Sequence, residues 1–175
     1  METTNSLLSA IRCFSCRHRA YILNILGGAV EYYGSNLAAL AVFGSYARGD
    51  NRKNSDLDLL VVLKKAPPRR QRLEEFARQV EEKYEELAQE IYEEEDIYCE
   101  VSPYILTVEE ALMFQPVYFD FAEHHLIVFD GEGILERVIS SVKRLMRAAG
   151  ARKIPCGNRW GWETTECSFL GGRVL

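Results

Sequence analysis

Two aspartates separated by one residue, Asp56 and Asp58, open an apolar run that extends to Leu63. Side chains two residues apart in a β-strand project from the same face. A strand here would therefore aim both carboxylates at one point while Leu57 and Leu59 enter the core. Adjacent carboxylates repel each other and are stable as a charged pair when a cation lies between them. Their hard oxygen ligands suit magnesium, which takes its remaining ligands from water and from substrate phosphates.

A Gly-Ser pair, Gly44 and Ser45, precedes these aspartates by ten intervening residues. Glycine lets the backbone approach a phosphate closely, and a serine at the start of a helical turn offers a hydroxyl and free backbone amides. Arg48 follows the turn and can add positive charge near a triphosphate, although a surface ion pair is the alternative interpretation. Gly-Ser turns are common, and only the spacing to the aspartates gives this one functional meaning.

Apolar residues at three- and four-residue steps predict helices over residues 17–33, 70–91 and 134–146. The adjacent glycines Gly27 and Gly28 weaken the first helix and indicate either a close packing contact or a bend. Residues 108–123 also have helical character, with Pro116 as an interruption. The stripe of the second helix consists of Leu73, Phe76, Val80, Tyr84, Leu87 and Ile91.

Continuous apolar runs at 37–43 and 57–63 predict buried central strands, and 126–129 predicts a shorter strand. Alternation over 97–106 predicts a further strand with Tyr98, Glu100 and Ser102 on its polar face, and Pro103 marks an edge or an end. We therefore expect a mixed α/β (α+β) fold in which helices flank a central mixed β-sheet. We expect one domain over residues 1–175, with its core at about 37–106 and a C-terminal helix and tail over 131–175.

Composition narrows the function classes. A net charge of -5 disfavours a nucleic-acid-binding protein, because phosphate binding depends on clustered Lys and Arg. No apolar run approaches the roughly 20 residues of a membrane span, and the first residues lack the order of a signal peptide, so we expect a cytoplasmic protein. One basic cluster stands out, and it is typical of a solvated helix start: Arg12, Arg17, His18 and Arg19.

Other residues of chemical interest have ordinary interpretations. Cys13 and Cys16 could begin a zinc site, but its second half would have to come from Cys156 or Cys167 at no recognisable spacing. The remaining residues are His124 and His125, which we expect on the surface or at a helix end, and Trp160 and Trp162, which would share one face of a hairpin or extended tail and pack against the core.

The string Gly44-Ser45, ten residues, then Asp56-Leu57-Asp58 followed by apolar residues resembles the defining motif of the polymerase-β superfamily, and specifically its minimal nucleotidyltransferases. The resemblance implies a two-metal transfer of a nucleoside monophosphate, with ATP and two Mg²⁺ ions. It implies that Asp56 and Asp58 bind metal and that a third carboxylate on a neighbouring strand joins them. Glu100 fits that role, and Asp96 is the competitor.

The same resemblance implies an acceptor. Minimal members of this superfamily often act as antitoxins, so the implied reaction is AMP transfer onto a tyrosine of a small helical partner protein, a toxin. One alternative is a non-catalytic module that neutralises its partner by occlusion. Another is a transferase for a small molecule of the antibiotic type, for which this chain has little room.

Overall fold

The computed structural model describes residues 11–157 and 159–165. Its helices and strands alternate along the chain, as expected for a mixed fold. The α-helices and β-strands are α2 (Cys16–Tyr33), β1 (Leu37–Val42), α3 (Gly44–Arg48), β2 (Leu57–Leu63), α4 (Arg69–Phe76), α5 (Glu85–Glu95), β3 (Val101–Thr107), α6 (Val108–Ala111), α7 (Tyr118–Glu123), β4 (Leu126–Asp130), α8 (Ile134–Ala148), β5 (Arg152–Cys156) and β6 (Arg159–Glu163).

A four-stranded sheet in the order β3-β2-β1-β4 forms the centre of the molecule. Strand β1 pairs antiparallel with both β2 and β4, whereas β2 and β3 are parallel. The predicted mixed sheet is therefore confirmed. Strand β3 lies at one edge of this sheet, which accommodates Pro103 because an edge strand can leave one row of hydrogen-bonding groups unpaired.

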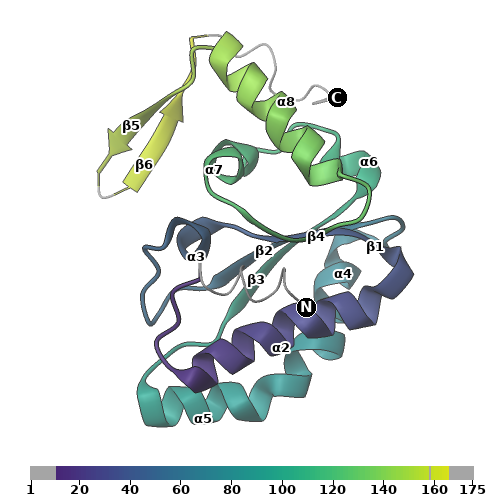
Figure 1. Ribbon diagram of the computed structural model, residues 1–175, viewed down its shortest axis with the longest axis vertical. Helices are drawn as coiled ribbons and strands as arrows, with labels where there is room; N and C mark the ends of the chain where they lie inside the picture. Colours follow the sequence, from purple (N-terminus) through teal and green to yellow (C-terminus); the bar gives the residue numbers. More distant parts are fainter. Residues whose placement is uncertain (1–10, 158, 166–175) are drawn as a thin grey trace.

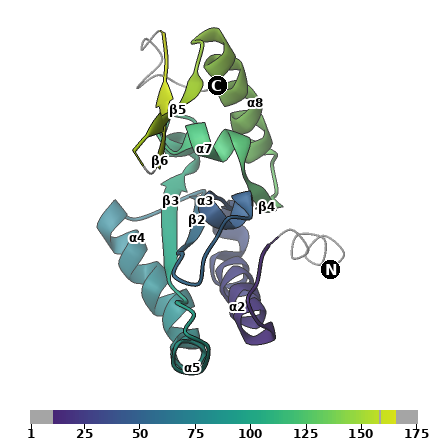
Figure 2. The same cartoon turned by 90° about the vertical axis from the view of Figure 1, so that its left-hand side faces the viewer.

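Helices cover both faces of the sheet (Figure 1). One apolar cluster joins α2, α4 and α5 to the sheet through Leu57, Leu59 and Val61, and the other joins α6, α7 and α8 to it through Leu60 and Val62. Both faces of β2 are therefore covered, which explains why its sequence is a continuous apolar run. Seen from the side, the β5–β6 hairpin lies beyond the sheet, beside α7 and α8 (Figure 2).

Helix α2 begins where the sequence predicts it. The Ser15 side chain accepts a hydrogen bond from the His18 N–H at 3.0 Å and caps the first turn. Gly28 faces the Tyr84 ring, and a Cβ at this position would lie 3.3 Å from Tyr84 Cε2. The close packing contact is thus the reason for one of the two adjacent glycines.

The predicted helix over 70–91 is partly wrong. A π-helical segment over Ala77–Glu81 and a 3₁₀ turn over Glu82–Tyr84 separate α4 from α5. Leu73 is 49% exposed, because the buried face of α4 runs through Arg72 and Phe76 instead. A four-residue step back from Phe76 reaches Arg72 and not Leu73, so the apolar residue is one position away from the buried face.

Pro116 separates α6 from α7, as predicted, and β5 and β6 form a hairpin over residues 152–156 and 159–163. Trp162 stacks on Phe119 with ring centroids 5.4 Å apart, and its indole N–H donates to Asp120 at 3.1 Å. This contact joins the hairpin to the rest of the fold. His124 is half-buried and caps the end of α7, which confirms its assignment to a helix end. In the described part of the chain, we find no helix that could cross a membrane.

Candidate functional site

The Gly-Ser turn and the first residues of β2 meet at one end of the sheet. The Phe43 N–H donates to the Asp58 carbonyl at 3.0 Å, which fixes the end of β1 against the start of β2. Gly44 follows with a φ of +66°, and a Cβ built on it would lie 1.9 Å from Asp58 Oδ2. Only glycine therefore allows the turn and the Asp58 carboxylate to occupy these positions together.

Asp56 and Asp58 act on each other electrostatically. Burial and, to a smaller extent, the negative charge of Asp56 raise the pKa of Asp58 to about 6, and Arg48 opposes the rise. Asp56 is exposed at the mouth of the site, whereas Asp58 is partly buried against Gly44. The pair thus carries negative charge that the surrounding side chains do not fully compensate.

The turn itself is the short helix α3. Ser45 is partly buried at its start, and the Asp50 N–H donates to the Ser45 carbonyl at 3.1 Å, which closes the turn. Gly49 ends α3 in the left-handed conformation with a φ of +76°. Arg48 forms an ion pair with Asp50 at 3.2 Å, as the alternative interpretation of this residue predicts. Its positive charge also opposes the rise in the pKa of Asp58.

The regular part of β3 begins at Val101, later than predicted, so Glu100 lies one residue before the strand. The Leu57 N–H donates to the Glu100 carbonyl at 2.8 Å, which holds Glu100 beside the Asp-x-Asp segment. Tyr98, Glu100 and Ser102 are exposed, whereas Ile97 is buried and Cys99 partly buried, so the predicted alternation is observed. Because Ser102 pairs with Asp58, Glu100 belongs to the same face as the aspartates. Asp96 instead ends α5 in a left-handed conformation, with a φ of +54°.

Within residues 11–157 and 159–165, no three His, Cys, Asp or Glu side chains approach closely enough to hold one metal ion. The structure brings Asp56 and Asp58 together as a pair, and Glu100 does not complete a cluster of three. Cys13 is partly buried and Cys16 is exposed. Cys167 and the side chain of Cys156 lie outside the described part, so the described residues do not test the zinc alternative.

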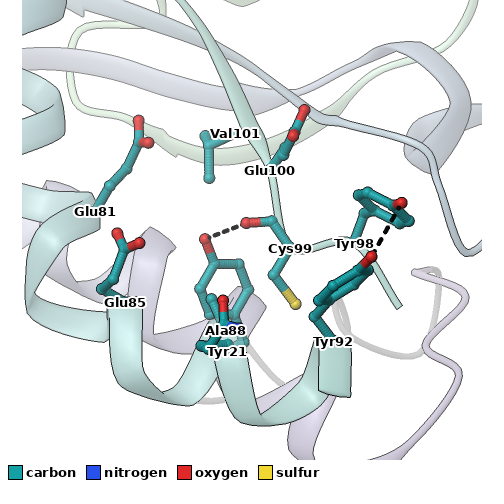
Figure 3. Close-up of a pocket in the computed structure, with 10 residues that line it drawn as sticks. Tyr21, Glu81, Glu85, Ala88, Tyr92, Tyr98, Cys99, Glu100 and Val101 are labelled. Atoms are coloured by element: carbon teal, nitrogen blue, oxygen red, sulfur yellow. Dashed lines mark hydrogen bonds between the residues drawn. The ribbon is translucent and has the colours of Figure 1, made fainter. Parts of the chain in front are cut away.

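A cavity of about 470 Å³ lies between α5 and the segment that leads into β3 (Figure 3). The Tyr21 hydroxyl donates to the Cys99 carbonyl at 2.8 Å at its base, and Tyr92 and Tyr98 pack edge to face at its rim. Glu81 and Glu85 line the side formed by the helix, and Glu100 lies on the opposite side of the segment from the Cys99 side chain (Figure 3). The cavity is acidic and aromatic, and its wall includes the candidate third carboxylate.

The burial of His18 and of Arg72 was not expected. His18 is 1% exposed, so its assignment to a solvated basic cluster is wrong. Its ring nitrogens contact the Phe14 N–H at 3.2 Å and the Tyr46 hydroxyl at 3.1 Å. Arg72 is 6% exposed and forms an ion pair with Glu110. The capping sequence Thr107 to Glu110 hints at an ordered Glu110, but no local pattern identifies its distant partner.

Comparison with known proteins identifies a family. Residues 24–128 match the model of the nucleotidyltransferase domain family. A segment of 40 residues is 48% identical to a Methanocaldococcus jannaschii protein named "Putative protein adenylyltransferase MJ1305" and spans 23% of this chain and 27% of that relative.

Solved structures of similar fold include a toxin-antitoxin crystal structure with AMP-PNP, at 16% identity and a TM-score of 0.41, covering 75% of this chain and 91% of that one. Another is a tri-AMPylated Shewanella oneidensis HEPN toxin in complex with MNT antitoxin, at 15% identity and a TM-score of 0.39, covering 74% and 92%. The chain belongs to the nucleotidyltransferase domain family, and the predicted family is confirmed.

Proposed function

We propose that this chain is a magnesium-dependent nucleotidyltransferase that moves AMP from ATP onto a hydroxyl group of an acceptor protein. The observation that carries this proposal is the placement of Asp58 directly over Gly44, with Asp56 beside it. This arrangement sets two carboxylates against a turn whose backbone a phosphate chain can approach closely.

The donor set fits magnesium. Asp56 and Asp58 provide carboxylate oxygens. Burial and the charge of Asp56 raise the pKa of Asp58, which disfavours its ionised form, and a bound divalent cation would favour that form. We expect both aspartates to bind two ions, with Glu100 as the third ligand once substrate is present. When bound, the ions would neutralise charge on the triphosphate and on the departing pyrophosphate.

The chain's own residues would orient the reactants. The Ser45 hydroxyl and the backbone N–H groups of the turn would donate hydrogen bonds to triphosphate oxygens, and Arg48 would add positive charge beside them. Glu100 would accept the proton of the acceptor hydroxyl. The hydroxyl oxygen then bonds to the α-phosphorus, the bond from that phosphorus to the bridging oxygen breaks, and pyrophosphate leaves.

A protein acceptor is supported by the name of the archaeal relative, which shares 48% identity over 40 residues. We place the acceptor segment at the cavity between α5 and the start of β3, because this cavity shares Glu100 with the proposed site. Its glutamates Glu81 and Glu85 favour an acceptor segment that carries a basic residue near the hydroxyl. A small helical protein encoded beside this chain is the acceptor to test first.

The experiment uses ATP labelled at its α-phosphate, with magnesium and the purified product of the neighbouring reading frame. We expect label on the acceptor protein, loss of labelling with a chelator, and loss with Asp58→Asn. Glu109→Gln is the matched control, because Glu109 is an exposed carboxylate on α6 outside the proposed site. Binding of the partner without any label, unchanged in an Asp56→Asn, Asp58→Asn double variant, would favour occlusion over catalysis.

A further inference from the structure

A chain of buried polar groups lies behind the Gly-Ser turn and joins it to the start of α2. His18, Tyr46 and Asn51 are 1%, 2% and 0% exposed. They come from α2, from α3 and from the loop that leads to Asp56. Buried polar side chains of this kind are costly unless they are hydrogen-bonded, so their clustering at one place calls for a reason.

The hydrogen bonds define the protonation of His18. The Phe14 backbone N–H can only donate, so His18 Nδ1 is the nitrogen that accepts, at 3.2 Å. Burial lowers the pKa of His18 and keeps the ring neutral, so its proton is on Nε2. Nε2–H therefore donates to the Tyr46 hydroxyl at 3.1 Å. Ser15 supports this geometry by capping the turn that carries His18.

Asn51 fixes the loop that follows α3. Its Nδ2 donates to the Arg12 carbonyl at 3.0 Å, which ties the loop after α3 to the segment before α2. Burial raises the pKa of Tyr46 strongly, and the Asn51 side chain opposes that rise. Asn51 Oδ1 is buried without a hydrogen-bond partner in the described part of the chain.

We propose that His18 and Asn51 are positioning residues: His18 holds Tyr46, Asn51 holds the loop after α3, and both keep the Gly44–Arg48 turn in the geometry that binds the triphosphate. The inference rests on the proposed function. Tyr46 directly follows Ser45 along the chain, so a shift of the Tyr46 ring would move the serine hydroxyl and the turn amides with it. Neither positioning residue touches the substrate in this proposal, and the effect of His18 passes through Tyr46.

The test compares two buried tyrosines. Tyr46→Phe removes one hydroxyl and keeps the ring. Tyr118→Phe is the matched control, because Tyr118 is 0% exposed and its hydroxyl donates to the Ala111 carbonyl at 2.8 Å, in the apolar cluster on the opposite face of the sheet. Both variants lose one buried hydrogen bond, so both should lower the melting temperature. We expect only Tyr46→Phe to weaken ATP binding, by about tenfold, the ratio equivalent to one lost hydrogen bond.

His18 provides an independent comparison. His18→Leu should weaken ATP binding as much as Tyr46→Phe, and the double variant should be no weaker than the worse single variant. His18→Gln keeps a side-chain N–H and should restore part of the affinity. Equal ATP binding by Tyr46→Phe and Tyr118→Phe would overturn the inference, as would full additivity of the two losses.

Hydrogen exchange separates this inference from the proposed function. Backbone amides of residues 44–56 should exchange faster in Tyr46→Phe than in the wild type, and Tyr118→Phe should leave them unchanged. A wild-type protein that binds no nucleotide would refute the transferase proposal, while the exchange rates would still decide whether Tyr46 holds the turn. Faster exchange with unaltered ATP binding would mean a structural role alone and would contradict the inference.

Discussion

The contact between Gly44 and Asp58 gives the most direct test of the site. Gly44 has a φ of +66°, and Gly49, five residues later, has a φ of +76°. An added Cβ at Gly49 meets no atom within 4 Å, whereas at Gly44 it would lie 1.9 Å from Asp58 Oδ2, 2.8 Å from Cγ and 3.2 Å from Cβ. The two alanine substitutions therefore share the backbone strain, and only one displaces the carboxylate.

The expected losses follow from these distances. A left-handed alanine costs about 1–2 kcal/mol, which is the whole expected effect of Gly49→Ala. Rotating the Asp58 carboxylate alone does not relieve the Gly44→Ala contact, because the Cγ atom is also too close. The side chain must leave its rotamer, which adds about 1 kcal/mol. Gly44→Ala should thus destabilise by about 2–3 kcal/mol.

The functional difference should be larger than the difference in stability. Displacing a carboxylate by about 1 Å costs on the order of 100-fold in rate, so Gly44→Ala should abolish most transfer while Gly49→Ala retains it. Denaturant unfolding and transfer of the α-phosphate label measure the two effects. In an Asp58→Ala background the two glycine substitutions should become equally destabilising. If Gly44→Ala and Gly49→Ala lose equal stability and equal activity with Asp58 present, the inferred contact is wrong.

Three further predictions concern charge. Because the pKa of Asp58 is raised in the folded state, this residue stabilises the fold most below about pH 4, and the stabilisation is lost as the pH rises through about 6. Asp58→Asn should therefore stabilise the metal-free protein by about 1 kcal/mol at pH 8. Thermal unfolding should then show a smaller change of stability with pH than in the wild type. Arg72→Ala should lower the free energy of unfolding by about 3 kcal/mol in denaturant unfolding, against at most about 0.5 kcal/mol for Arg70→Ala. Of the two, only Arg72 is buried, and its loss leaves the Pro67 and Ile105 carbonyls without their donor. Equal losses would refute this prediction. Glu100→Gln should lower the transfer rate at least about 100-fold while Asp96→Asn leaves it unchanged, and the reverse result would assign the third carboxylate to Asp96.

The elements around the aspartates could be predicted because their signals are local. The apolar runs of β1 and β2, the apolar spacing of α2 and the proline between α6 and α7 each depend on residues adjacent in the chain. The same is true of the Gly-Ser turn, whose spacing from Asp56 and Asp58 is visible without a structure. Local periodicity and turn chemistry are therefore sufficient for the sheet and for the two carboxylates of the site.

Long-range polar contacts could not be predicted. Arg72 occupies a buried position that an apolar stripe would assign to a neighbouring leucine, and it is stabilised there by Glu110, 38 residues later. His18 looks like part of a basic surface cluster, but its ring is buried and hydrogen-bonded to the Tyr46 hydroxyl, 28 residues away. A charged or polar residue is buried only when distant partners satisfy it, and no window of sequence contains those partners.

The interval between the Gly-Ser pair and the aspartates is itself part of the site. Its ten residues include Tyr46 and Asn51, which are fixed to α2 and to the segment before it. Lys53 accepts a hydrogen bond through its carbonyl from the Tyr98 N–H at 2.8 Å, two residues before Glu100. The connection thus places the phosphate turn, the aspartate pair and the candidate third carboxylate relative to one another. Its length is set by these contacts, so an insertion within it should disturb all three groups even though each would keep its sequence.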